Sequence, residues 1–300
     1  MKLLNNFKPY FVLVILLILS SCSSLGSLKF WEDDDVDEET PAQLNSISEN
    51  RFLERVWSVS NGNDITYGRL IPVIYEGKVF YINSSGYISS VDLDSGKLLW
   101  SKDTQDIVSS GLDVSHKTIS YVTLDGSIVA LDSKNGDEIW RSLTSSESLS
   151  PPVNSGSHII TQTVDGRVSA YNLKSGKRDW FHQTVLPTLT LRGTSRPFID
   201  QGFVFTGFAS GKVAMFYPDT GALRLELPIT LNEGKSELER IIDIDGKSVV
   251  VNDLLIAATY QGNISAINLR DGRPVWQEDI STVKDLTSNG NRVVSVDSKD

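Results

Sequence analysis

A spacing of glycines and tryptophans repeats along the chain, and it is the feature that most constrains the fold. In one copy Gly126 is followed ten residues later by Gly136, and Trp140 comes four residues after that. The same spacing recurs in Gly86, Gly96 and Trp100, in Gly166, Gly176 and Trp180, and in Gly262, Gly272 and Trp276. A fifth copy consists of Gly211, Gly221 and Leu225, without the tryptophan. Such self-similarity indicates a repeat architecture.

Each copy has the pattern of two strands joined by a tight turn. Residues 127–132, Ser-Ile-Val-Ala-Leu-Asp, place their side chains on alternate faces of a strand. A turn-forming residue precedes the second glycine in every copy: Ser95, Asn135, Ser175, Thr220 and Asp271. The glycine itself supplies the positive φ that a hairpin turn with a bulge requires.

The residue four positions after the first glycine is small in most copies. These residues are Ser90, Ala130, Ala170, Met215 and Ala266. We expect the small side chains to let a neighbouring sheet approach closely, while the tryptophan fills the space beside them. One unit cannot bury its faces alone, so neighbouring units must stack. The sequence therefore predicts an all-β fold, a β-propeller of four-stranded blades. An open β-solenoid of the same repeats is the alternative.

Composition narrows the class of protein. The chain has 300 residues, of which 40% are hydrophobic and 22% charged, as in an ordinary globular protein. Cys22 is the single cysteine, so no intrachain disulfide can form. The net charge of −10 argues against nucleic acid or an anionic membrane surface as a partner.

The N-terminus has the features of a lipoprotein signal. Lys2 and Lys8 precede an apolar run, Phe11 to Leu19, which is too short to span a bilayer and fits a signal peptide. Residues 19–22, Leu-Ser-Ser-Cys, resemble the bacterial lipobox, in which cleavage precedes a lipid-modified cysteine. We predict a signal peptide over 1–21 and acylation of Cys22. Ser23 after this cysteine favours the outer membrane, by analogy with lipoprotein sorting.

The remaining chain divides into a tether and the repeats. Residues 22–50 carry the acidic runs 32–35 and 37–39 and are expected to form an extended spacer, with an acidic docking site as the alternative. Residues 51–300 are expected to form the propeller. Trp57 belongs to no complete copy and is interpreted as part of a last strand that closes a blade with the other chain end. Residues 291–297 resemble the strand before each glycine motif, so we expect the chain to end within a sixth repeat, with further C-terminal blades missing.

Two insertions interrupt the repeat, and they carry the candidate binding residues. First glycines are 40 residues apart for two steps, then 45, then 51. The extra residues lie between Trp180 and Phe203 and between Leu225 and Val250, and we expect the two loops to be neighbours on one face. The candidate partner-binding residues are Leu189, Leu191 and Arg192 in the first insertion and Asp243 and Asp245 in the second.

Arginine suits a protein interface, because its planar fork binds carboxylates and backbone carbonyls. The alternative is that Arg192 pairs with Asp243 or Asp245 within the chain. Ser236 and Glu239 have the spacing of a capping box that could open a short helix.

No pattern indicates catalysis or metal binding. His116, His158 and His182 are far apart in sequence and have no cysteine partners, so we predict no metal site. The sequence has no nucleophile motif, Walker loop or dinucleotide fingerprint. No catalytic residue and no cofactor are therefore predicted.

The repeat as a whole resembles the PQQ-type propeller motif, and together with the lipobox it resembles the BamB family of outer-membrane assembly lipoproteins. The similarity covers residues 50–300 and is sharpest in LTLRGTSRP, in SELERIIDIDG and in VVVNDLLIAATYQGNISAINLRDGRPVW. The resemblance implies an eight-bladed ring and a non-enzymatic scaffold, anchored in the outer membrane and facing the periplasm of a Gram-negative bacterium. It also implies that Leu189, Leu191, Arg192, Asp243 and Asp245 bind the POTRA domains of BamA, and that other components of the β-barrel assembly machinery are partners.

Two other functional classes share the propeller repeat. A PQQ-dependent quinoprotein dehydrogenase is the main alternative, although such enzymes are usually far longer, with a catalytic aspartate and calcium-binding acids. A carbohydrate-binding or adhesive propeller is the other.

Overall fold

A computed structural model describes residues 54–62, 70–230 and 235–297. The chain divides into two units, Met1–Asn45 and Ser46–Asp300, and the described residues all belong to the second. Cys22, the signal peptide and the acidic tether lie outside the described residues. In the described part, no helix is long and apolar enough to cross a membrane.

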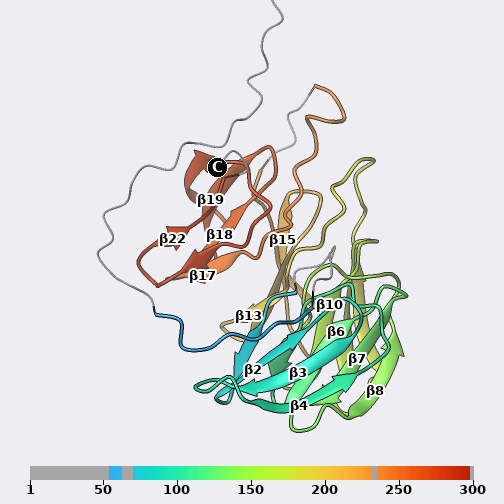
Figure 1. Ribbon diagram of the computed structural model, residues 1–300. Helices are drawn as coiled ribbons and strands as arrows, with labels where there is room; N and C mark the ends of the chain where they lie inside the picture. Colours follow the sequence, from blue (N-terminus) through green and yellow to red (C-terminus); the bar gives the residue numbers. More distant parts are fainter. Residues whose placement is uncertain (1–53, 63–69, 231–234, 298–300) are drawn as a thin grey trace, which may run out of the picture. The chain divides into compact units, whose positions relative to one another are not determined.

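The described residues form antiparallel sheets, each built from strands that follow one another in the sequence (Figure 1). The first contains β1 (Val73–Tyr75), β2 (Lys78–Ile82), β3 (Tyr87–Asp92) and β4 (Leu98–Asp103), and the second contains β5 (Asp113–Ser115), β6 (Thr118–Val122), β7 (Ser127–Asp132) and β8 (Glu138–Leu143). The third contains β9 (Val153–Asn154), β10 (His158–Gln162), β11 (Arg167–Asn172) and β12 (Arg178–Gln183). The fourth contains β13 (Phe198–Asp200), β14 (Phe203–Gly207), β15 (Lys212–Phe216) and β16 (Leu223–Pro228). The fifth contains β17 (Val249–Val251), β18 (Leu254–Ala258), β19 (Asn263–Asn268) and β20 (Pro274–Asp279), and β21 (Thr287–Ser288) pairs with β22 (Val293–Val294).

These four-stranded sheets are the blades of a β-propeller, as predicted. The first strands of neighbouring sheets contact each other, β1 with β5, β5 with β9 and β17 with β21. The buried core lies between adjacent blades: Phe80 and Ile88 of the first blade cluster with Ile119 and Leu131 of the second. The expected total of eight blades stays a prediction.

The second glycine of each repeat lies in the turn between the third and fourth strands, as predicted. Gly136 has a φ of 74°, and its N–H donates to the carbonyl of Asp132 over 2.8 Å. The Asp132 carboxylate in turn accepts the N–H of Lys134. A register shift between Ala130 and Leu131 marks the bulge that this turn creates. The recurring Asp or Asn at this position therefore has a structural role in the turn.

The repeated tryptophan docks on the second glycine of the next blade. The Trp140 ring lies against Gly176, so a Cβ at that glycine would meet the ring at 2.6 Å, and the indole N–H donates to the carbonyl of Leu173 over 2.8 Å. The same docking joins Trp57 to Gly96 and Trp180 to Gly221. The Trp100 ring also lies on Gly136, but its indole N–H has no hydrogen-bond partner among the described residues. Trp57 thus packs on the first blade as the last strand of a preceding blade would, which agrees with its interpretation as an orphan. Its pairing with the other chain end remains a prediction.

The tryptophan lies beside the small residue of the repeat, as predicted. Ala130 lies directly opposite Trp140 across β7 and β8, and in the degenerate fourth blade Met215 lies opposite Leu225. A small residue therefore accompanies the large ring, and a larger residue accompanies the smaller leucine. The pair keeps its combined volume, which is what a close-packed interior requires.

Candidate partner-binding site

The two predicted insertions are the connections from β12 to β13 and from β16 to β17. They span residues 184–197 and 229–248, of which 231–234 lie outside the described residues. Each connection leads from the last strand of one blade to the first strand of the next. The structure brings the two loops together as predicted, because the N–H of Leu191 donates to Asp243 Oδ2 over 2.7 Å.

Asp243 supports the first loop from inside the protein. It is 1% exposed, and its Oδ1 has no hydrogen-bond partner among the described residues. Burial and the charge of nearby Asp245 raise the pKa of Asp243 to about 7, while the bond from the Leu191 N–H acts in the opposite direction. A carboxyl group held in this way positions a loop and does not itself present a charge to solvent.

Asp245 is also buried, and it packs against the backbone of the same loop. A Cβ placed on Gly193 would collide with the Asp245 carboxylate. Only glycine permits this approach, which explains the residue that follows Leu191 and Arg192. The two aspartates of the candidate site therefore lie beneath the loop that carries its apolar and cationic residues.

Arg192 has a different partner from the two aspartates considered in the sequence. Its Nη2 lies 2.7 Å from Oε1 of Glu147, in the connection between β8 and β9. The Arg192 side chain is 64% exposed, so much of its guanidinium is still available to another molecule. Because the pair is partly exposed, its contribution to stability is small. Its main effect is to fix where the cation points.

Apolar side chains lie on the same loop as this cation and in a hollow next to it. Leu189 is 41% exposed and Leu191 is half-buried. Beside Arg192 lies a hollow of about 440 Å³, lined in part by Ile107, Leu124 and Leu149. Ile107 is 64% exposed, and Leu124 is exposed as well. Sequence reasoning missed this hollow, because apart from Arg192 its residues belong to repeats of regular length and carry no insertion to mark them.

Hydroxyl groups link successive loops on this side of the blades. The Ser150 hydroxyl donates to the carbonyl of Ser195 over 2.9 Å, and the Ser195 hydroxyl donates to that of Gly246 over 3.3 Å. The Thr194 hydroxyl accepts the N–H of Leu149 over 3.0 Å. Ser150 and Ser195 each stand three residues before the first strand of a blade, and this recurrence is the signal that could have found them. The bonds make the candidate site a set of connected loops.

The predicted capping box forms, but no helix follows it. The Glu239 carboxylate accepts the N–H groups of Lys235 and Ser236, and the Glu239 N–H donates to the Ser236 hydroxyl. In the described part of this loop, residues 237–240 form only a turn. The box therefore stabilises an irregular loop.

Comparison with known proteins identifies the family. The model of the family described as outer membrane protein assembly factor BamB matches residues 84–300. The protein of that name from Kangiella koreensis is 41% identical over 97% of this chain and 73% of its own length. The one from Pseudomonas aeruginosa is 43% identical, covering 92% of this chain and 71% of the relative, and the one from Escherichia coli is 32% identical, covering 94% and 74%.

Comparison with solved structures leads to the same family. The crystal structure of BamB from Moraxella catarrhalis superimposes with a TM-score of 0.71 at 26% identity, over 76% of this chain and 69% of that one. A quinohemoprotein alcohol dehydrogenase from Comamonas testosteroni has a TM-score of 0.54 at 14% identity, over 75% of this chain and 45% of that enzyme, so it shares only the propeller fold. The family model, the sequence relatives and the structural match all lead to one assignment. This chain belongs to the BamB family of outer membrane protein assembly factors.

Proposed function

We propose that this chain is a non-enzymatic scaffold lipoprotein of the outer-membrane β-barrel assembly machinery. Its relatives are named as outer membrane protein assembly factors, which supports a role in that process. In this proposal the protein faces the periplasm, is anchored to the outer membrane through Cys22, and assists the insertion of β-barrel proteins. The alternative, a quinoprotein dehydrogenase, is supported only by similarity of fold.

The finer proposal is that the site around Arg192 binds the periplasmic POTRA domains of BamA. The observation that carries it is the exposed guanidinium of Arg192 beside exposed apolar side chains, on a loop held from below by a buried carboxylate. Arginine and large apolar groups in a rigid setting are typical of the residues that dominate protein interfaces. Leu189, Leu191 and Arg192 would contact the partner, and Asp243 and Asp245 would position the loop.

The hollow beside Arg192 extends this surface. Ile107 and Leu124 are exposed apolar side chains that line the hollow next to a cation, and exposed apolar patches mark interaction sites on soluble proteins. An apolar ridge on the POTRA surface that enters the hollow, with a carboxylate or carbonyl at its edge for Arg192, would satisfy both features.

The test is calorimetric titration of purified BamA POTRA domains with the Leu191→Ala/Arg192→Ala double variant. We expect the dissociation constant to rise by about 30-fold, because an interface residue of this kind typically contributes at least ~2 kcal/mol. The matched control is Leu223→Ala/Arg224→Ala, which removes an exposed leucine and arginine from β16. Affinity like that of the wild type in the first variant, with unchanged thermal stability, would exclude this site.

A further inference from the structure

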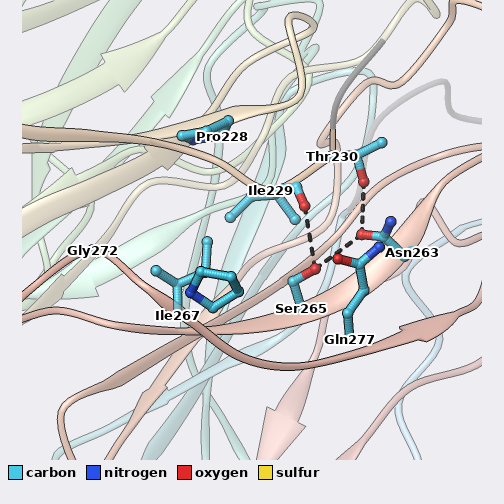
Figure 2. Close-up of a pocket in the computed structure, with 9 residues that line it drawn as sticks. Pro228, Ile229, Thr230, Asn263, Ser265, Ile267, Gly272 and Gln277 are labelled. Carbon is cyan, nitrogen blue, oxygen red and sulfur yellow. Dashed lines mark hydrogen bonds between the residues drawn. The ribbon is translucent and has the colours of Figure 1, made fainter. Parts of the chain in front are cut away.

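The cleft between the fourth and fifth blades contains polar groups that pair with one another. The hydroxyls of Thr230 and Ser265 lie 2.7 and 2.9 Å from Asn263 Oδ1 (Figure 2). The Ser265 hydroxyl also lies 3.2 Å from the carbonyl oxygen of Ile229. Buried polar groups need such partners, and here the chain itself supplies them. The charged side chains on the outside of the third blade are in a different situation.

The third blade differs from the others in its charge. Its residues 153–183 include four basic and two acidic side chains, whereas every other complete blade in the described part has more acidic than basic residues. The basic residues lie in β11, in β12 and in the turn between these strands: Arg167, Lys174, Lys177 and Arg178. In a chain with a net charge of −10, this blade is a basic exception.

The basic side chains of the third blade also lack ion-pair partners. Each of the other complete blades has at least one lysine or arginine in an ion pair, namely Lys102, Arg141, Lys212 and Arg270. Across the residues that the structure describes, none of the four basic side chains of the third blade forms such a pair. The two carboxylates of this blade bond to other groups, Asp165 to the Thr163 hydroxyl and Asp179 to the His158 ring.

Two of these cations lie against one exposed aromatic ring. The Cζ atoms of Arg167 and Arg178 are 4.9 and 5.2 Å from the centroid of the Phe181 ring, within the range of cation–π contacts. The Nε–H of Arg167 donates to Gln183 Oε1 over 2.9 Å, which orients this guanidinium. The ring and the neighbouring amide therefore hold the cations in place without neutralising them.

Phe181 is unusual for its position in the repeat. It stands one residue after the tryptophan, where the other blades carry Ser101, Arg141, Glu226 and Gln277. Its side chain is 53% exposed, and its strand β12 is at the edge of the sheet. Since polar residues suffice at this position in the other blades, packing between blades does not require the ring.

We propose that Arg167, Arg178 and Phe181 form a docking surface for an acidic segment of a protein partner. Charge complementarity is the argument for this occupant, because guanidiniums bind carboxylates through two parallel hydrogen bonds. Lys174 and Lys177 add to the positive field that attracts such a segment. This surface lies on the strands of the third blade and not on the loops around Arg192, so the proposal does not depend on binding of POTRA domains there.

The geometry also limits the spacing of the partner's carboxylates. The two guanidinium Cζ atoms can be no further apart than the sum of their distances to the ring centroid, 4.9 + 5.2 = 10.1 Å. In an extended segment, alternate side chains point to the same face and their Cα atoms are about 7 Å apart. Two glutamates separated by one residue can therefore reach both cations, with their methylene groups against the Phe181 ring.

The first experiment titrates the full chain, labelled with 4-fluorophenylalanine, with the peptide acetyl-Ser-Glu-Ser-Glu-Ser-amide and records ¹⁹F NMR spectra. Loss of one resonance in Phe181→Ser assigns the Phe181 signal. We expect this signal to shift saturably, while those of the buried Phe80 and Phe205 stay in place, and the shift should weaken at high salt. The control peptide has glutamine in place of both glutamates. No shift at Phe181, or an equal shift with the glutamine peptide, would overturn the proposal.

A pair of charge-matched variants tests the location of the site. Arg167→Gln/Arg178→Gln should weaken binding of the glutamate peptide at least about fivefold, because both carboxylates lose a cation. Arg270→Gln/Arg273→Gln removes the same charge from the turn between β19 and β20 and should change the affinity by less than about twofold. Melting temperatures confirm that both variants are folded. Equal losses in the two variants would show that only net charge matters and would refute a site on the third blade.

The class of partner is tested with an anionic lipid. Dihexanoylphosphatidylglycerol, below its micelle concentration, replaces the peptide in the same titration. We expect it to bind more weakly than the glutamate peptide, because a single phosphate cannot bridge two separated guanidiniums as two carboxylates can. Tighter binding of the lipid at Phe181 would assign these cations to a membrane surface and refute an acidic protein segment as the occupant.

Discussion

The paired volumes at the repeat position make a quantitative prediction about packing. Ala130 faces Trp140 in the second blade, and Met215 faces Leu225 in the fourth. We therefore consider Trp140→Leu, Ala130→Met and the double variant, which transplants the fourth-blade pair into the second blade. If combined volume is what matters, the two changes must compensate each other.

The structure sets the size of each effect. Trp140→Leu removes most of a buried ring that packs on Gly176 and Tyr171, and it leaves the carbonyl of Leu173 without its indole donor. Complete truncation of such a ring costs about 3–5 kcal/mol, so we expect roughly 2–4 kcal/mol for leucine. Ala130→Met inserts atoms at a fully buried position and should cost about 1–3 kcal/mol.

The double variant should cost less than the sum of the single variants by at least ~1 kcal/mol, since the methionine occupies space that the indole leaves. A residual cost of about 1 kcal/mol remains for the hydrogen bond to Leu173. Urea unfolding of the four proteins gives the free energies. Additivity within about 0.5 kcal/mol would refute the idea that the two positions share one volume.

Three further predictions concern other parts of the chain. Gly136→Ala should lower the free energy of unfolding by at least ~2 kcal/mol more than Gly202→Ala in denaturant melts, because both glycines have positive φ but only Gly136 is covered by Trp100. The pKa of Asp243 is about 7 in the folded protein and has its ordinary value of 3.8 in the unfolded chain. Between about pH 4 and about pH 7 the folded state therefore binds a proton at Asp243 that the unfolded state has lost. Stability should therefore fall as pH rises from about 4 to about 7, by up to ~1.4 kcal/mol per pH unit, and Asp243→Asn should lose this slope in melts across that range. Cys22→Ser should abolish acylation, so palmitate label that persists on the variant would contradict a lipobox.

Local spacing was sufficient to predict the blades, because the information that specifies a hairpin lies within about fifteen residues. Gly136 and the alternation over 127–132 predicted the turn and β7 correctly. The surface on which Trp140 docks could not be predicted, since that depends on how one blade lies against the next. The spacing also does not reveal a difference in backbone conformation in the fifth copy. The other first glycines have a positive φ, whereas here the residue with a positive φ is the preceding Gln261, at 49°.

The candidate site, too, could be predicted from the sequence only in part. The two insertions revealed both loops, and the bond from Leu191 to Asp243 joins them. The partner of Arg192 was not predictable, because Glu147 stands in a connection of ordinary length and only the stacking of blades brings it close. Burial of Asp243 was also hidden, since two aspartates in a loop usually face water.

The absence of the indole from the fourth blade, where Leu225 replaces it, affects how the molecule opens. In a repeat protein each unit contacts only its neighbours, so stability is approximately a sum of unit and junction energies. Among the junctions between complete described blades, the one at Leu225 has neither the ring nor its bond to a neighbouring carbonyl. Partial unfolding therefore costs least there, and the blades on either side exchange their amide hydrogens as separate cooperative units.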